Sequence, residues 1–199
     1  MNQRFIYLAS ASPRRRELLD QIGVRYRLCP VDIDETPQPG EAPLDYVRRV
    51  AGEKAAAAAE QLHESGSEGT VLAADTTVVI DGDTLGKPRD RAEGLAMLAR
   101  LSAAEHDVLT AVCAVHDGRL HADTSATRVV FRNISDSERK TYWASGEPSD
   151  KAGAYSIQGR GAVFIERIEG SYSGVMGLPL YETGRLLRQC GVVVMSEEG

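Results

Sequence analysis

The sequence of 199 residues contains few cysteines and no long apolar segment. The three cysteines, Cys29, Cys113 and Cys190, lie far apart and lack the paired spacing of a zinc site, so we expect reduced, partly buried thiols. No apolar run approaches the roughly 20 residues that cross a bilayer, and the amino-terminal apolar segment is too short for a signal peptide. We therefore expect a cytoplasmic protein with no membrane partner.

Common nucleotide-binding motifs are also missing from the sequence. Neither the Walker A loop nor the dinucleotide motif G-x-G-x-x-G occurs, which disfavours P-loop phosphoryl transfer and hydride chemistry. The four histidines have neither metal-binding nor catalytic spacing. The formal net charge of -6 opposes nonspecific binding to nucleic acid, so we expect no nucleic-acid partner. A small phosphorylated ligand fits this composition better.

The bulk composition is that of a globular protein. Hydrophobic residues make up 42% and charged residues 26% of the chain, so disorder is not indicated. One hydrophobic core is the default below roughly 250 residues, and the sequence has no internal repeat or obvious linker. We expect a single domain over residues 1–199, with two lobes as an open possibility.

The amino-terminal stretch has the pattern of a strand, a turn and a helix start. Residues 5–9 are strand-like, after which Pro13 can take the first helical position and Ser12 can cap the free amide groups. Three arginines then occupy residues 14–16, where a helix already carries partial positive charge. An anion would compensate, so the stretch predicts a phosphate site made of the Ser10 and Ser12 hydroxyls, the turn amides and at least one arginine. The alternative is a helix whose polar face is basic.

The rest of the chain alternates helical and strand patterns. Apolar periodicity, turn residues and capping signals divide it into successive elements. We expect a strand at 24–29, a helix at 44–62, a strand from 70 that turns at Asp81-Gly82, a helix at 92–99, antiparallel strands at 106–116 and 120–132, a helix capped by Ser135, a strand at 162–165 and a closing helix from Leu180 to Cys190.

Two groups of charged residues are open to more than one interpretation. Three carboxylates at residues 32–35 end with Glu35, and such a loop is either plainly solvated or a cation site. On the helix at 44–62, Lys54 and Arg48 fall on opposite flanks of the apolar face. Either cation could reach a neighbouring cleft, or either could be an ordinary surface residue. The spacing does not choose between them.

The strongest chemical signal is Asp75, which interrupts an apolar strand pattern. A carboxylate among such residues is costly to bury unless it binds a cation, accepts several hydrogen bonds or takes up a proton. This cost favours a functional role over a turn or cap. Further along, Lys87 stands between Gly86 and Pro88, in a loop suited to holding an anion but also common as an ordinary turn.

Short motifs that contain these residues occur along nearly the whole chain. Together they resemble the Maf family of nucleoside triphosphate pyrophosphatases. The motifs are Ser10-Ala11-Ser12-Pro13-Arg14-Arg15, Glu35, Glu53-Lys54-Ala55, Ala74-Asp75-Thr76, Gly86-Lys87-Pro88, Ala152-Gly153-Ala154-Tyr155, Ile157-Gln158-Gly159 and Gly177-Leu178-Pro179.

The resemblance implies a fold and a reaction. The expected fold is α/β and similar to that of the inosine triphosphate pyrophosphatases, with an elongated mixed sheet, flanking helices and two lobes around a nucleotide cleft. The expected reaction cleaves a nucleoside triphosphate between its α- and β-phosphates, with Mg²⁺ or Mn²⁺ as cofactor. A homodimer is also implied.

The resemblance further assigns roles to single residues. It makes Asp75 the proton acceptor or metal-linked base and Glu35 its acidic partner, so that both are the expected metal ligands. The groups that would hold the triphosphate are Ser10, Arg15, Lys54 and Lys87.

The most detailed implication of the resemblance concerns which nucleotide the protein selects. The Ala-Tyr-x-Ile-Gln-Gly motif resembles the branch of the family that acts on dTTP and UTP, in which positions matching Arg14, Thr76 and Gln158 are associated with substrate choice. The amide of Gln158 could pair with a pyrimidine edge. Two alternatives are kept: a pyrophosphatase for 7-methyl-GTP or a non-standard purine, and a nucleotide-binding regulator of septum formation.

Overall fold

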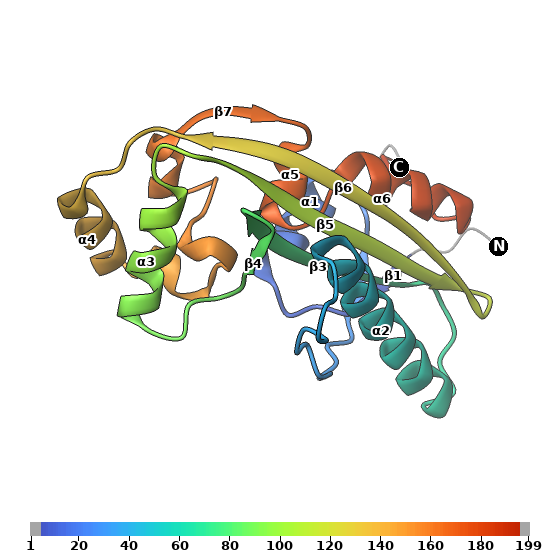
Figure 1. Ribbon diagram of the computed structural model, residues 1–199. Coiled ribbons are helices and arrows are strands. Elements are labelled where there is room, and N and C mark those ends of the chain that lie inside the picture. Colours follow the sequence, from blue (N-terminus) through green and yellow to red (C-terminus); the bar gives the residue numbers. More distant parts are fainter. Residues whose placement is uncertain (1–4, 196–199) are drawn as a thin grey trace.

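The computed structural model describes residues 5–195 and has an α/β fold built on one mixed sheet. The expected elongated sheet with flanking helices is confirmed, and Figure 1 shows strands β5 and β6 running along most of the molecule. The strands are β1 (Ile6–Leu8), β2 (Tyr26–Leu28), β3 (Val71–Ile80), β4 (Asp83–Leu85), β5 (Glu105–His116), β6 (Arg119–Phe131) and β7 (Ile165–Glu169).

The strand order in the sheet is β2-β1-β3-β5-β6-β7, with β4 paired to β3 outside this path. Strands β2, β1 and β3 are parallel to one another, whereas β5, β6 and β7 join by antiparallel pairing. The predicted turn between β3 and β4 is present, with Asp81 and Gly82 both at positive φ (53° and 82°). Positive φ at both central residues is the requirement of the tight hairpin turns that match strand twist.

Helices cover both faces of the sheet. In Figure 1, α2 and α6 lie on opposite sides of the long strands, and α3 and α4 stand together at the far end. The helices are α1 (Pro13–Gln21), α2 (Pro43–Glu64), α3 (Arg91–Leu101), α4 (Asp136–Ala144), α5 (Tyr172–Met176) and α6 (Leu180–Gln189), with 3-10 helices at Glu147–Asp150, Ala152–Ala154 and Arg160–Phe164. The capping box predicted at Ser135 is confirmed, since its side chain and that of Glu138 bond each other's backbone amides.

Three local predictions are wrong. Ser12 occupies the N-cap position of α1, but its side chain makes no capping hydrogen bond. The strand expected at 24–29 is reduced to Tyr26–Leu28, because only these residues are in register with β1. The segment 162–165 is the end of a 3-10 helix and only the first residue of β7, because the chain turns there before it pairs with β6.

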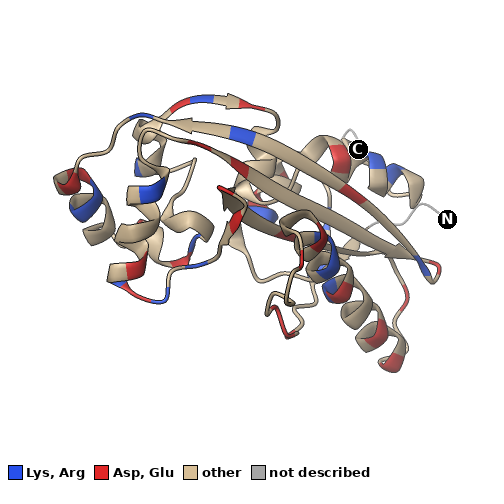
Figure 2. Ribbon diagram, in the orientation of Figure 1, with Lys and Arg blue, Asp and Glu red and all other residues tan. Residues whose placement is uncertain are grey.

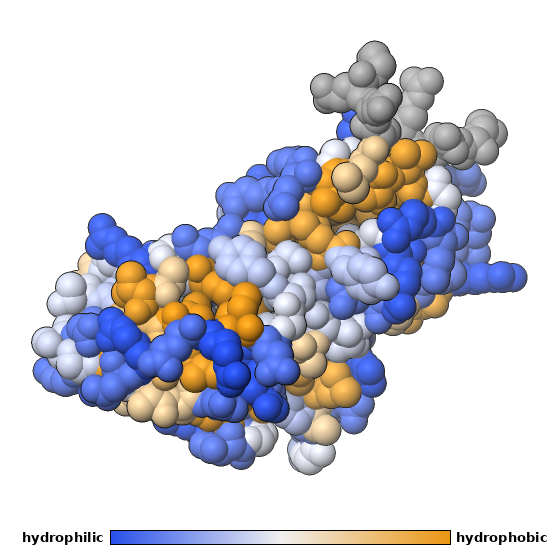
Figure 3. Space-filling model, turned by 90° about the horizontal axis from the view of Figure 1, so that it is seen from above, coloured by the Kyte–Doolittle hydropathy of each residue, from blue (hydrophilic) through white to orange (hydrophobic). Residues whose placement is uncertain are grey.

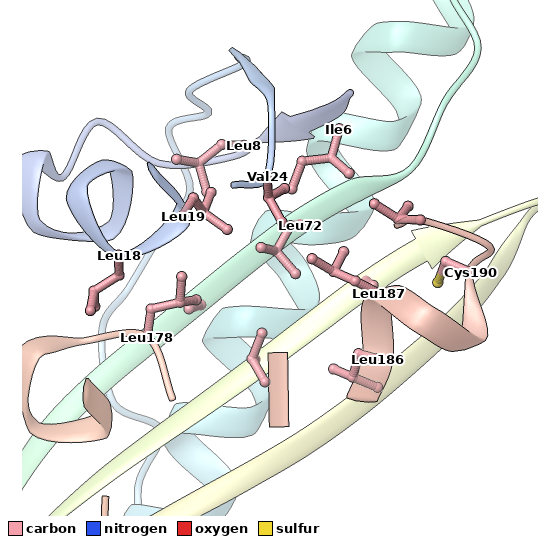
Figure 4. Close-up of a cluster of buried hydrophobic side chains, with 14 of the residues drawn as sticks. Ile6, Leu8, Leu18, Leu19, Val24, Leu72, Leu178, Leu186, Leu187 and Cys190 are labelled. Atoms are coloured by element: carbon pink, nitrogen blue, oxygen red, sulfur yellow. The ribbon is translucent and has the colours of Figure 1, made fainter. Parts of the chain in front are cut away.

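Alternation along the strands gives each face of the sheet its own hydrophobic cluster. On one face, Leu8 of β1 and Leu72 of β3 pack against α1 and α6 (Figure 4). On the other face, Tyr7 and Ala73 contribute to a cluster formed with α2. A third cluster, around Phe131, lies under α3 and α4. The sheet is therefore covered on both sides near its centre.

The three cysteines are buried and free, as expected from their spacing. Within residues 5–195, no helix combines the length and the apolar composition that a membrane crossing needs. Acidic and basic residues are interspersed over the helices and loops (Figure 2).

Candidate active site

A cleft of about 570 Å³ opens beside the middle of β3. Its walls come from the turn after β1, the loop after β2, α2, β3, the loop after β4, the segment around residues 150–158 and the end of α5. All nine residues predicted for the site line this cleft: Ser10, Arg14, Arg15, Glu35, Lys54, Asp75, Thr76, Lys87 and Gln158. The structure thus brings together groups that are as far apart in sequence as Ser10 and Gln158.

One wall of the cleft presents Ser10 and Arg15. The Arg15 guanidinium donates to Ser10 Oγ at 3.1 Å and to the carbonyl oxygen of Gly177 at 2.8 Å, which ties α1 to the end of α5. The Ser12 amide also donates to Ser10 Oγ at 3.2 Å. Because Ser10 Oγ accepts both bonds, its own O–H is free to donate to an anion. The hydroxyl and the guanidinium are held in place before any ligand binds.

Burial has a clear electrostatic effect on Arg15. It lowers the pKa of the guanidinium from its ordinary value, and the charge of Asp75 partly offsets this effect. An arginine nevertheless stays protonated in proteins. A partly buried permanent cation that lines a cleft is well suited to bind phosphate oxygens.

The facing wall holds a carboxylate pair that shares one ammonium. The alternation of β3 points Asp75 toward α2, where Lys54 Nζ lies 2.9 Å from Asp75 Oδ1 and 2.8 Å from Glu35 Oε1. Only 12% of the Lys54 side chain is exposed, whereas half of the Glu35 side chain is. The structure also decides between the two cations of α2, because Arg48 donates to Thr124 Oγ1 on β6, away from the cleft.

The buried carboxylate of Asp75 has a shifted pKa. Burial raises its pKa above the ordinary value, although the charges of Lys54 and Arg15 act in the opposite direction. A carboxylate with a raised pKa is a stronger base than an exposed one. Asp75 therefore combines a protected position with basicity suited to accepting a proton from water.

The carboxylates fit a divalent cation that also contacts the ligand. Both Asp75 and Glu35 reach the same ammonium, so their oxygens can approach one cation. Within the described residues, no group of three or more His, Cys, Asp or Glu side chains could hold a metal alone. Mg²⁺ commonly takes one or two carboxylates and completes its shell with phosphate oxygens and water. The donor set is consistent with that arrangement.

The predicted selection residues also line the cleft. Thr76 Oγ1 is 3.0 Å from Thr110 Oγ1, and Thr110 in turn donates to the carbonyl oxygen of Gly174. The Thr76 hydroxyl therefore donates to Thr110 and keeps its lone pairs for a ligand. Arg14 lies 3.9 Å from Asp150, and Gln158 is exposed on the cleft wall.

Several cleft residues escaped the sequence reasoning. Tyr46 donates to the carbonyl oxygen of Glu35 at 3.1 Å, and burial beside Asp75 raises the Tyr46 pKa to about 12. Asp150 and Lys151 form an ion pair at the rim. The position of Tyr46, two helical turns before Lys54, was the available signal, but spacing alone does not place a tyrosine beside a loop.

Comparisons with known proteins agree with the geometry. A family model described as "Maf-like protein" matches residues 5–190. Three similar proteins bear the name "dTTP/UTP pyrophosphatase". One, from Bordetella parapertussis, is 54% identical over 194 residues, covering 95% of this chain and 94% of the relative.

The other two come from Nitrosomonas europaea and Hydrogenovibrio crunogenus. The Nitrosomonas protein is 52% identical over 198 residues and covers 95% of this chain and 96% of its own length. The Hydrogenovibrio protein is 49% identical over 187 residues, with 94% and 96% covered. The similarity therefore extends over the whole cleft and is not confined to one motif.

Proposed function

The chain belongs to the Maf family, and we propose that it is a nucleoside triphosphate pyrophosphatase that hydrolyses dTTP and UTP to the monophosphate and pyrophosphate. The observation that carries this function is the cleft in which Asp75 and Glu35 share the Lys54 ammonium and which Ser10 and Arg15 also line. The names of the similar proteins support dTTP and UTP as substrates.

Binding of the triphosphate depends on the cationic groups. Ser10 and Arg15 would donate to phosphate oxygens from one wall, and Lys54 would do so from the other. Lys87 is exposed at the cleft and has no ion-pair partner within the described residues, so its charge is available to the ligand. Cations held in place before the reaction stabilise the charge that develops on the leaving group.

The hydrolytic step depends on Asp75. It would accept a proton from the water whose oxygen bonds to the α-phosphorus, while the bond from that phosphorus to the bridging oxygen breaks and pyrophosphate leaves. Its raised pKa favours this proton transfer. Asp75 and Glu35 would also hold a Mg²⁺ or Mn²⁺ ion together with the phosphates. Such an ion neutralises phosphate charge and polarises water.

A nucleotide panel tests this function. Purified protein is incubated with each triphosphate and Mg²⁺ or Mn²⁺, and pyrophosphate and orthophosphate are measured separately. We expect pyrophosphate from dTTP and UTP, loss of activity in EDTA and a loss of about 10³-fold or more in kcat for Asp75→Asn. Asp117→Asn, an identical change at a side chain that is 87% exposed, should keep full activity.

Each alternative gives a different result in the same panel. Preferred cleavage of 7-methyl-GTP or a non-standard purine would refute dTTP and UTP as substrates. Release of orthophosphate would refute the proposed cleavage site. Tight nucleotide binding without turnover under either metal would favour the regulator of septum formation.

Location and assembly remain predictions. The absence of a membrane-crossing helix within residues 5–195 is consistent with the proposed cytoplasmic location. The face shown in Figure 3 has several separate hydrophobic patches, each bordered by hydrophilic residues. We propose a homodimer on the resemblance alone, and light scattering after size-exclusion chromatography measures its mass.

A further inference from the structure

In the segment 155–161, residues 155–158 line the cleft, and Gln158 is the last of them. Gln158 itself is exposed, and the structure gives its side chain no hydrogen bond within the described residues. Its position must therefore come from the backbone on either side of it. That backbone is held by side chains that do not line the cleft.

Tyr142 and Glu147 hold the segment from behind. The Tyr142 hydroxyl accepts from the Ser156 amide at 3.0 Å and donates to Glu147 Oε1 at 2.7 Å. The Glu147 carboxylate also accepts from the amides of Arg160 at 2.8 Å and Gly161 at 3.1 Å. The two side chains thus bind the backbone two residues before and two to three residues after Gln158.

The glycines of the segment fit this arrangement closely. A Cβ atom on Gly159 would overlap the Glu147 carboxylate, and one on Gly161 would lie 2.6 Å from the Tyr142 hydroxyl oxygen. Side chains larger than hydrogen would push the backbone away from its two anchors. The absence of side chains at these positions is what allows Tyr142 and Glu147 to reach the amides.

The Glu147 carboxylate is ionised, which strengthens the hydrogen bonds that it accepts. Burial acts to raise the pKa of Glu147, but hydrogen bonds from the Arg160 amide and Tyr142 outweigh it, so the pKa is lowered overall. Burial raises the pKa of Tyr142, which therefore keeps its proton. An ionised carboxylate accepts from three donors, and hydrogen bonds to charged acceptors are about twice as strong as neutral ones.

A second anchor holds the start of the segment. The Tyr155 hydroxyl is 2.9 Å from Nε2 of His106 on β5. The rings of Tyr155 and His106 both pack edge-on against Phe131, with centroids 4.8 and 4.9 Å away. Tyr155 is therefore tied to the sheet, and the Tyr142–Glu147 pair holds the residues that follow.

We propose that Tyr142 and Glu147 are positioning residues that hold Gln158 in place for recognition of the nucleotide base. This inference rests on the proposed function and names a selectivity element of the same site. The phosphate-binding groups Ser10 and Arg15 stand on α1 and the turn before it, so they do not depend on these anchors. Loss of the anchors should weaken base recognition and leave phosphate binding intact.

The test compares Tyr142→Phe and Glu147→Gln with the wild type. Phenylalanine leaves the Ser156 amide without its acceptor, and glutamine turns an N–H group toward backbone N–H donors. We expect KM for dTTP and UTP to rise about 10-fold with kcat changed less than about 2-fold. The inhibition constant of inorganic tripolyphosphate should stay unchanged. Tyr181→Phe, at a side chain 73% exposed, is the matched control.

Amide hydrogen exchange of residues 155–161 gives a second measurement. Faster exchange in both variants, together with the change in KM, would support the proposal. A lower Tm with unchanged KM would overturn it, because the anchors would then be merely structural. Equal weakening of tripolyphosphate and nucleotides would also overturn it.

Failure of the proposed function is recognised separately. If the wild type releases no pyrophosphate from dTTP or UTP, that function is wrong. In that case, equilibrium binding of dTTP and tripolyphosphate to the wild type and both variants tests the role of Tyr142 and Glu147 alone. Weaker binding of dTTP by the variants, with unchanged binding of tripolyphosphate, would still support them, and equal binding of dTTP by all proteins would refute them.

Discussion

Buried His106 should make the stability of the protein fall as the pH is lowered. Only 3% of this residue is exposed, and burial lowers its pKa from about 6.5 to about 4. The folded protein therefore keeps the ring neutral, whereas the unfolded chain takes up a proton below about pH 6.5. Since the unfolded state binds more protons between these values, acid favours unfolding in that window.

The size of the effect follows from the two pKa values. Above about pH 6.5 the ring is neutral in both states, and His106 does not lower the free energy of unfolding. As the pH falls from 6.5 toward 4, protonation of the unfolded chain lowers this free energy by about 3 kcal/mol in total. About 2 kcal/mol of this loss falls between pH 7 and pH 5. For a chain of this length, that corresponds to a Tm lower by roughly 5 °C.

Urea unfolding of the wild type and His106→Gln at pH 7 and pH 5 measures this loss. Glutamine does not titrate and can still reach the Tyr155 hydroxyl. Neighbouring charges, such as Glu105, Asp107 and Arg128 around the adjoining cavity, are the same in both proteins and cancel in the difference. The reasoning is refuted if the stability difference between the two proteins is equal at both pH values. His63→Gln, at an exposed position, should behave as the wild type.

Two further predictions concern the cleft and the helices. Replacing Lys54 by Met should lower kcat/KM about 10²- to 10³-fold. It should also move the acidic limb of the pH–rate profile to higher pH, because the Lys54 charge is a main cause that lowers the pKa of Asp75. An unshifted acidic limb would contradict this role of Lys54. Gly94→Ala should cost about 1–3 kcal/mol in urea unfolding, because the new Cβ would overlap the Trp143 ring. Gly52→Ala, in a helix where the new Cβ would meet only Leu120 Cδ2 at 3.9 Å, should instead gain about 0.5–1 kcal/mol. The same sign for both changes would be contrary to the packing argument.

The sequence predicted the elements whose signals are local. Helix α2 repeats apolar residues at steps of three and four, and the capping box at Ser135 lies within four residues, so both were predicted. The 3-10 helix at Arg160–Phe164 was not, because its first amides are bound by Glu147, which lies 13 and 14 residues earlier. No apolar pattern in the segment itself reveals that contact.

The residues that line the cleft could be named from the sequence, but the contacts among them could not. Asp75 was recognisable because a carboxylate in an apolar strand is costly. Helical spacing left the choice between Lys54 and Arg48 open, because both flank the same helix face and only the position of the sheet separates them. The family resemblance alone pointed to Lys54. The anchors Tyr142 and Glu147 were missed because the sequence does not show which backbone amides they reach.

The position of Asp75 explains how the fold tolerates a buried carboxylate. Strand β3 passes through two hydrophobic clusters on one face, with Leu72 in the first and Val78 in the second. Between them, Thr76 on that face and Asp75 on the opposite face line the cleft. On the face that carries Asp75, the members of the α2 cluster on β3 are Val71 and Ala73, so the carboxylate lies at the edge of that cluster, where the cleft begins. Lys54, which comes from the same helix, compensates the charge of the carboxylate. The apolar run in the sequence is thus interrupted at the point where β3 passes from the α2 cluster into the cleft.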